Sequence, residues 1–203
     1  MTVLYLHGKG GAASECEHYA PLFPGCRVEG LDYKTFTPWE TGEEIRAAVK
    51  ALRQAGECVI LVANSIGALF ALYAGVDDLI ERAYFISPVV DMEGLICGWM
   101  RSLGVTEDEL RAKGVIETPF GDPLSWDYLC FVRQNPVQWH APTDILYGGN
   151  DALTPYETIA AFAAKTGARL CVMKDGEHWF HTAEQLRFLD QWIKRSERKK
   201  AIT

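Results

Sequence analysis

The sequence predicts an α/β fold of three layers, doubly wound around a mostly parallel sheet of about six strands. Short apolar runs rich in β-branched residues alternate with longer helical patterns along most of the chain. This alternation is typical of a parallel sheet that is covered by helices on both faces. The chain has 203 residues, which is enough to bury a substantial core in one domain. We therefore expect a single domain over residues 1–203.

The predicted strands are short apolar runs that end at a glycine, a proline or a polar corner. They cover residues 2–6, 26–31, 59–63, 83–86, 144–147 and 169–173. Helix signals separate them, and the predicted helices begin at or near Ser14, Thr41, Leu69, Thr154 and Thr182. Thr154 is expected to cap its helix, with Pro155 at the first helical position. The basic tail 194–200 is expected to be a solvated, frayed helix end.

Residues from about 89 to 140 break the alternation of strands and helices. This segment is rich in aromatic and apolar residues, and Thr106–Glu109 is typical of a helix start. It is too apolar to remain a solvated linker, so we expect an inserted, mostly helical cap. Two interpretations of the cap remain open. It packs on the sheet as a purely structural element, or it roofs an active site.

Composition indicates which classes of protein are excluded. The residues are 48% hydrophobic and 23% charged, as in ordinary globular proteins, and the formal net charge of −7 disfavours a nucleic-acid-binding surface. The six cysteines form no C-x-x-C pair or Cys/His cluster, which predicts free thiols, a cytoplasmic location and no metal site. We expect neither a signal peptide nor a membrane segment. The expected partner is a small molecule, and the chain itself is expected to be a monomer or homodimer.

Ser65 lies where a buried strand turns sharply into a helix, which is the arrangement called a nucleophile elbow. Such a turn brings the residues two before and two after the serine close together, so both must be small. Ala63 and Gly67 satisfy this requirement. The usual pattern is G-x-S-x-G, and Ala63 replaces its first glycine. A serine that merely caps a helix is the alternative interpretation of this stretch alone.

Four polar features follow four different predicted strands. They are the glycine-rich loop His7–Gly11, Ser65, Asp151 and His178. In open α/β sheets, ligands bind at the carboxyl ends of the strands, so we expect these four features to meet at one edge of the sheet.

These features together resemble the α/β-hydrolase superfamily, in a small form without antiparallel strands ahead of the first parallel one. The resemblance covers nearly the whole chain except the insertion. The matching motifs are His7-Gly8 after the first strand, Ala63-Asn64-Ser65-Ile66-Gly67 at the elbow, Ile145–Asp151 with Pro155 following, and Gly176-Glu177-His178-Trp179-Phe180 before the last helix. The order Ser, Asp, His along the chain is the order of that superfamily's triad.

The resemblance implies a role for each of these side chains. Ser65 is the expected nucleophile, His178 the general acid and base, and Asp151 the carboxylate that orients the imidazole. A developing oxyanion needs preorganised donors, and the resemblance implies the backbone N–H groups of Ile66 and Lys9.

Gly8 and Asn64 complete the residues expected at the oxyanion and substrate site. The Lys9 side chain either reaches an anionic substrate group or is simply solvated. Asn64 either shapes the pocket or helps the turn.

Other residues compete for two of these roles. Asp91 follows the strand that ends at 86 and is a second candidate for the orienting carboxylate. His181 and His7 are weaker candidates for the base.

The expected activity is that of a serine hydrolase that cleaves a small carboxylic ester or related acyl compound through an acyl-enzyme, with no cofactor. A thioesterase, a peptidase or amidase on the same triad, and a non-catalytic binding protein of the same fold remain alternatives. Nucleotide binding is disfavoured, because Gly8–Gly11 lacks the G-x-x-x-x-G-K-[ST] pattern of a phosphate-binding loop.

Overall fold

The computed structural model describes residues 1–200, with side chains described through residue 198. The chain divides into two compact units. One consists of Met1–Val90 together with the chain from Trp139 onward, and the other is Asp91–Gln138. The second unit lies within the segment 89–140 that sequence predicts to be an insertion.

The first unit is built on a six-stranded sheet in which every neighbouring pair of strands is parallel. This confirms the predicted fold class. In spatial order the strands are β2 (Arg27–Gly30), β1 (Thr2–Leu6), β3 (Val59–Asn64), β4 (Arg82–Ile86), β7 (Thr143–Gly148) and β8 (Arg169–Met173). The chain runs outward from β1 to β2 and then returns to the other side of β1 with β3. The point where the strand order reverses is where doubly wound sheets bind their ligands.

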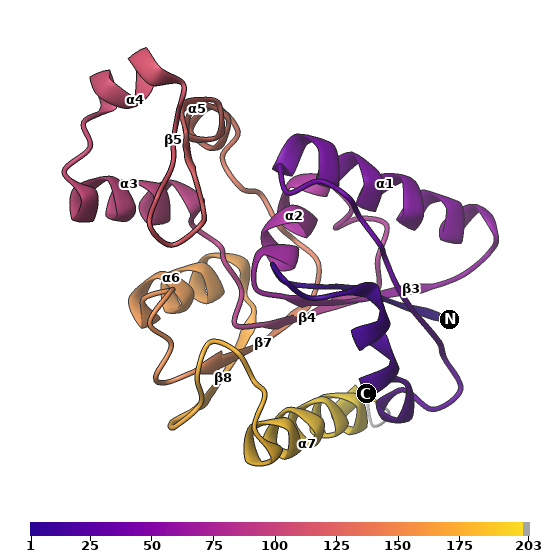
Figure 1. The fold of residues 1–203 in the computed structure, drawn as a ribbon. Coiled ribbons are helices and arrows are strands. Elements are labelled where there is room, and N and C mark those ends of the chain that lie inside the picture. Colours follow the sequence, from indigo (N-terminus) through magenta and orange to yellow (C-terminus); the bar gives the residue numbers. More distant parts are fainter. Residues whose placement is uncertain (201–203) are drawn as a thin grey trace. The chain divides into compact units, whose positions relative to one another are not determined.

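Helices cover both faces of this sheet (Figure 1). On one face lie α1 (Pro38–Gln54), α2 (Ile66–Ala74) and α6 (Tyr156–Thr166). On the other lie α7 (Ala183–Lys200) and two short 3-10 helices, η1 (Ala13–His18) and η2 (Ala20–Leu22). Successive side chains of a strand point to opposite faces. In β3, for example, Ile60 and Val62 pack in the core beneath α7 with Trp192 and Ile193.

Two helix starts differ from the prediction. The helix α1 begins at Pro38, ahead of Thr41, because a proline at the first helical position is already preorganised and needs no N–H partner. Thr41 is buried inside it. Thr154 does not cap α6, which begins at Tyr156 with Pro155 as its N-cap. The Thr154 hydroxyl instead donates to the Asp151 carboxylate at 2.9 Å.

The segment near Ser14 and the basic tail 194–200 also differ in part from the prediction. The segment near Ser14 forms a 3-10 helix and not an α-helix. The basic tail forms the last turns of α7, which continues through Lys200. Within that tail Ser196 is buried, and Glu197 accepts hydrogen bonds from the Tyr84 hydroxyl and from Arg82.

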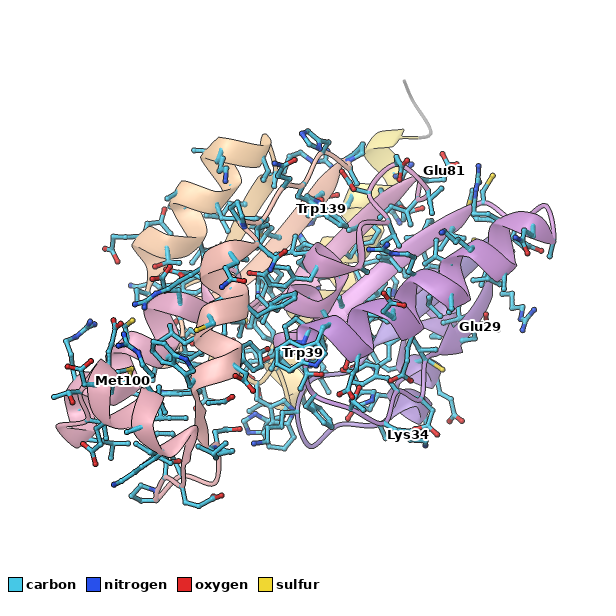
Figure 2. All side chains as sticks on the ribbon, turned by 90° about the horizontal axis from the view of Figure 1, so that it is seen from above. Glu29, Lys34, Trp39, Glu81, Met100 and Trp139 are labelled. Atoms are coloured by element: carbon cyan, nitrogen blue, oxygen red, sulfur yellow. The ribbon has the colours of Figure 1, made fainter. Side chains whose placement is uncertain are left out.

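Trp139 marks the return of the chain to the sheet (Figure 2). Its ring is buried, with its centroid 5.4 Å from that of Phe85 on β4. Its indole N–H donates to the Thr143 hydroxyl at 2.7 Å, at the first residue of β7. The aromatic side chain thus fixes the start of the strand that leads to Asp151.

The second unit contains three helices and a two-stranded antiparallel ribbon. These are α3 (Met92–Leu103), α4 (Glu107–Lys113), α5 (Trp126–Gln134) and the paired strands β5 (Val115–Ile116) and β6 (Leu124–Ser125). Arg133 on α5 bonds Glu93 on α3 at 2.7 Å and Glu107 on α4 at 2.6 Å, so one guanidinium joins the three helices. The sequence predicts the helical character of this unit but not its ribbon, whose strands are only two residues long.

Candidate active site

The loops that follow β1, β3, β7 and β8 meet at the carboxyl edge of the sheet, as the sequence predicts. Ser65 follows β3 and has φ of 52° and ψ of −119°, one of two non-glycine residues with positive φ among those described. This backbone conformation is costly for a residue with a Cβ atom. Its N–H donates to Ile86 at 2.9 Å, and its carbonyl accepts from Val89 at 3.1 Å. These bonds to the end of β4 hold the strained turn in place.

Close packing at the elbow explains the small residues on either side of the serine. A Cβ atom on Gly67 would lie 2.6 Å from the carbonyl oxygen of His7 and 2.7 Å from that of Leu6. Ala63 is fully buried in β3, where it pairs with Leu6 of β1. The first turn of α2 can therefore rest directly on the end of β1.

Glycines also bring the loops of Asp151 and His178 together. A Cβ atom on Gly148 would lie 2.4 Å from the Glu177 carbonyl oxygen, and one on Gly149 would lie 2.2 Å from that of Lys174. Only a residue without a side chain permits this contact between the loop after β7 and the loop after β8. Asp151 and His178, which are 27 positions apart in the chain, are thereby held within hydrogen-bond distance of each other.

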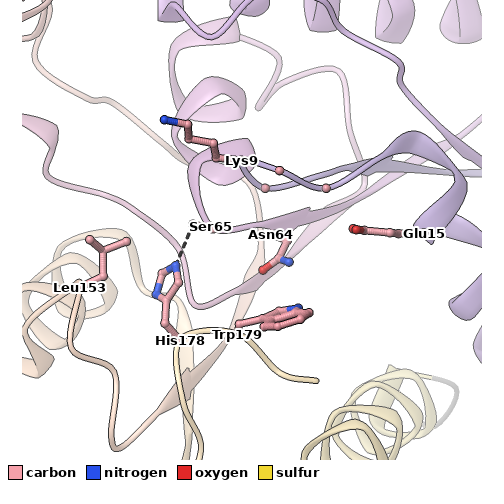
Figure 3. A pocket seen from close by; sticks show the side chains of 10 residues that line it. Lys9, Glu15, Asn64, Ser65, Leu153, His178 and Trp179 are labelled. Carbon is pink, nitrogen blue, oxygen red and sulfur yellow. Dashed lines mark hydrogen bonds between the residues drawn. The ribbon is translucent and has the colours of Figure 1, made fainter. Parts of the chain in front are cut away.

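The three side chains form one hydrogen-bonded chain. Ser65 Oγ lies 2.8 Å from His178 Nε2, and His178 Nδ1 lies 2.7 Å from Asp151 Oδ2. The first of these contacts is drawn in Figure 3. A carboxylate accepts hydrogen bonds only, so Nδ1 carries the proton and Nε2 is left to accept the serine proton. The Asp151 side chain is fully shielded from solvent, whereas that of His178 is 23% exposed.

The surroundings of Asp151 favour its charged form. Burial by itself raises the pKa of this carboxyl, but the hydrogen bond and charge of His178 oppose burial, as do two backbone N–H groups. Those groups belong to Leu153 and Thr154, which donate to Oδ1 at 2.8 and 3.0 Å. The result is a pKa below the ordinary value for aspartate.

The loop after β1 is fixed by an aromatic pair that the sequence analysis missed. The His7 imidazole donates from Nδ1 to the Gly8 carbonyl at 2.8 Å and stacks on Tyr33, with ring centroids 4.1 Å apart. The Tyr33 hydroxyl donates to the His7 carbonyl. Tyr33 follows the carboxyl end of β2, and that position is the signal by which the sequence marks it.

A cavity of 410 Å³ opens beside Ser65 and His178 (Figure 3). Its walls include three of the residues expected there from sequence, Gly8, Lys9 and Asn64. The sequence analysis assigned no role to three other wall residues, which are Glu15, Leu153 and Trp179. Trp179 follows His178 directly, so its place in the chain already pointed to this cavity.

The remaining predicted donor is the N–H of Ile66. Ile66 is the first residue of α2, directly after Ser65. The first N–H groups of a helix have no acceptor within that helix, and the helix dipole adds positive charge there. Both properties suit an N–H group that faces a developing negative charge.

The other candidate residues lie elsewhere or have other partners. The Asp91 side chain accepts from the Gly94 N–H as the N-cap of α3. His181 donates from Nδ1 to the Trp179 carbonyl at 2.8 Å. The His7 side chain bonds the Gly8 carbonyl and stacks on Tyr33, as described above.

The described part of the chain has neither a metal-binding cluster nor a membrane-spanning helix. Within residues 1–200, no group of three or more His, Cys, Asp or Glu side chains is placed to hold a metal ion. Across the same residues, no helix combines the length and the apolar character needed to cross a membrane.

Solved structures resemble this chain closely in fold. Est1E from Butyrivibrio proteoclasticus matches 100% of this chain and 88% of its own, with a TM-score of 0.77 and 19% identity. The chain has the α/β-hydrolase fold. The α/β hydrolase domain-containing protein 10 from mouse matches 98% of this chain and 90% of its own, with a TM-score of 0.71 and 16% identity. A structure of Est1E with ferulic acid bound has a TM-score of 0.74 and 19% identity over 100% of this chain and 90% of that one.

Similarity in sequence covers much less of the chain than similarity in fold. No family model matches the chain. A Mycoplasma genitalium protein named "Putative esterase/lipase 3" is 36% identical over 61 residues. That match covers 30% of this chain and only 22% of the relative. The expected resemblance to the α/β-hydrolase superfamily is confirmed at the level of the fold.

Proposed function

We propose that this protein is a serine hydrolase that cleaves a carboxylic ester of a small molecule through an acyl-enzyme. The observation that carries the proposal is the hydrogen-bonded chain from Ser65 through His178 to Asp151, with spacings of 2.8 and 2.7 Å. Ser65 and His178 line a cavity of 410 Å³, a volume within the size range of small-molecule sites. The name "Putative esterase/lipase 3" of the Mycoplasma protein favours the same chemistry.

The first half of the proposed reaction forms the acyl-enzyme. Ser65 Oγ attacks the ester carbonyl carbon while His178 Nε2 takes the serine proton, and Asp151 stabilises the resulting imidazolium. The carbonyl oxygen becomes an oxyanion, which the N–H groups of Ile66 and Lys9 stabilise. The bond to the alcohol oxygen then breaks, and His178 returns its proton to that oxygen. The alcohol leaves, and the acyl group remains on Ser65.

The second half reverses these roles with water. His178 Nε2 takes a proton from a water molecule, whose oxygen attacks the acyl carbon. The bond between the acyl carbon and Ser65 Oγ breaks as His178 returns the proton to Oγ, and the carboxylic acid is released. The reaction consumes one water and needs neither a metal nor an organic cofactor.

A substitution of Ser65 tests the proposal directly. The wild-type protein should hydrolyse p-nitrophenyl acetate and react with a fluorophosphonate probe, whereas S65A should do neither and keep the same thermal unfolding midpoint. Esterase activity that survives in S65A would exclude Ser65 as the nucleophile. A wild-type protein that leaves both reagents unchanged would contradict the enzymatic proposal. Esters of graded acyl length, thioesters and aminoacyl amides then define the bond that is cleaved.

A further inference from the structure

A second cavity lies next to the one beside Ser65. The second cavity has a volume of 340 Å³, and it shares three wall residues, Glu15, Asn64 and Trp179, with the first. These common walls place the two cavities side by side, and we call the pair the groove; its near end is at the Ser65 hydroxyl. In Figure 3, Glu15 and Trp179 lie on the side of Ser65 away from Leu153, which gives the direction of the groove. Its far part is mostly apolar and includes Phe180, Leu186 and Leu189.

Trp179 offers a flat surface that is held in position without a ligand. Its indole stacks on the His181 ring, with centroids 4.4 Å apart and planes 20° apart. The His181 imidazole donates to the Trp179 carbonyl, and the His181 N–H donates to the Gln185 side chain at 3.1 Å. Trp179 is nevertheless 68% exposed, the most exposed of the large hydrophobic residues described. One face of the indole is therefore supported while other parts remain open to a ligand.

Glu15 places a fixed acceptor in the same groove. The Tyr5 hydroxyl donates to Glu15 Oε2 at 2.6 Å, and Tyr5 itself is only 1% exposed. Burial raises the pKa of Tyr5, so this hydroxyl keeps its proton and stays the donor. An ionised carboxylate accepts about four hydrogen bonds, so Glu15 keeps capacity for a donor from a ligand. A negatively charged group at the same place would be repelled.

We propose that this groove binds an aromatic part of the substrate, and this inference rests on the function proposed above. The ring of the ester stacks on Trp179, and a hydroxyl group on that ring donates a hydrogen bond to Glu15. The preferred substrates are thus esters with a phenolic ring, and esters with an anionic substituent on the ring are rejected. Stacked aromatic pairs give selectivity beyond simple apolar burial, since the geometry of two flat surfaces is matched.

Binding of a ketone analogue tests the groove independently of catalysis. The probe is 4-phenylbutan-2-one, in which a CH2 group replaces the ester oxygen and no ring hydroxyl can reach Glu15, and its partner is 4-cyclohexylbutan-2-one. The protein is S65A, so that no covalent adduct forms, and calorimetry measures each Kd. The phenyl ketone should bind about 3- to 10-fold more tightly than the cyclohexyl ketone, which corresponds to the usual strength of an aromatic pair. Adding W179L should remove that preference, and adding W179F should retain part of it.

A charge series tests Glu15 with a matched control on the same 3-10 helix. Glu15→Gln should strengthen binding of the 4-carboxyphenyl ketone by about 5-fold and weaken binding of the 4-hydroxyphenyl ketone by about 10-fold. Glu17→Gln removes an equally exposed carboxylate that lines neither cavity. It should change neither value, so any general effect of net charge is separated from a contact in the groove.

The outcomes separate this inference from the proposed function. Equal Kd values for the phenyl and cyclohexyl ketones, or a preference that W179L leaves intact, would overturn the aromatic groove even if esters are hydrolysed. A preference lost in W179L would uphold the groove, even if the wild-type protein hydrolyses no ester and the proposed function fails. Steady-state kcat/KM for methyl 3-(4-hydroxyphenyl)propanoate and 2-(4-hydroxyphenyl)ethyl acetate then shows whether the acyl or the alcohol part occupies the groove.

Discussion

Replacing Asp151 by Asn should abolish most activity while leaving the fold intact. The Oδ1 atom accepts two backbone N–H groups at 2.8 and 3.0 Å, so an amide oxygen must occupy that place. The amide NH2 group then replaces Oδ2 and points at His178 Nδ1, 2.7 Å away in the wild-type protein. Two donors cannot share that contact, so the imidazole proton moves to Nε2. His178 then presents N–H to Ser65 and cannot take its proton.

The wrong tautomer predicts a large effect on kcat and a small one on stability. The same Asp-to-Asn change behind the catalytic histidine of a serine protease lowers kcat by about 10⁴-fold. We expect a fall of that size for p-nitrophenyl acetate near neutral pH, with KM altered far less. Stopped assays at high enzyme concentration measure the residual rate, and thermal unfolding verifies that D151N is folded.

Asp91 provides the matched control, because it was the second candidate for the same role from sequence. Its side chain caps α3 through the Gly94 N–H at 2.8 Å, and asparagine is an equally good N-cap. D91N should therefore keep both kcat and stability. A D151N variant within tenfold of wild-type kcat, or a D91N variant that loses activity, would refute the reasoning.

Three further predictions follow from the packing around the site. Gly67→Ala should lower the free energy of unfolding by at least about 1–3 kcal/mol, because the added Cβ would lie 2.6 Å from the His7 carbonyl oxygen. Urea unfolding measures this free energy, and an unchanged midpoint would contradict the prediction. Tyr33→Phe leaves the buried His7 carbonyl without its donor, so stability should fall by about 1–3 kcal/mol and kcat should fall more than KM rises. The folded-state pKa of Asp151 lies below its unfolded value, so its stabilising contribution is present above the unfolded pKa of about 3.9 and is lost as pH falls through the folded pKa. Unfolding free energies from pH 7 down to about 3 should thus fall more steeply for wild type than for D151N.

Much of the fold could be predicted from the sequence because burial dictates it locally. The strands of a covered parallel sheet are apolar throughout, so runs such as 59–63 and 83–86 can be recognised as strands from the sequence alone. The errors occurred where tertiary contacts decide an element's end. Thr154 looks like a helix cap in sequence, but its hydroxyl donates to Asp151, and the helix starts at Tyr156, one residue later than expected. The tail beyond residue 195 looks solvated, yet a buried Ser196 and the contacts of Glu197 keep it helical.

The sequence predicts Ser65, Asp151 and His178 and part of the cavity wall, but not the whole of that wall. Ser65, Asp151 and His178 carry distinctive neighbours and each follows a strand, so topology alone places them at one edge of the sheet. Glu15 lies in no such motif, and Trp179 lies in one only as the neighbour of His178. Their place in the cavity depends on the path of a 3-10 helix and on the stacking of Trp179 on His181, and neither is encoded in a short pattern.

The departure of this elbow from the usual G-x-S-x-G pattern has a physical reason in the packing. The two small positions differ in what they face. Gly67 lies on the first turn of α2 directly above the Leu6 and His7 carbonyl oxygens, where even a methyl group would overlap backbone atoms. Ala63 is still within β3, in register between Leu6 and Phe85, where a side chain points out of the pleat and away from the paired backbones. A methyl group at that position is buried completely, and it packs where a glycine would leave the strand more flexible. The geometry that strains Ser65 therefore requires a glycine after the serine and only a small residue before it.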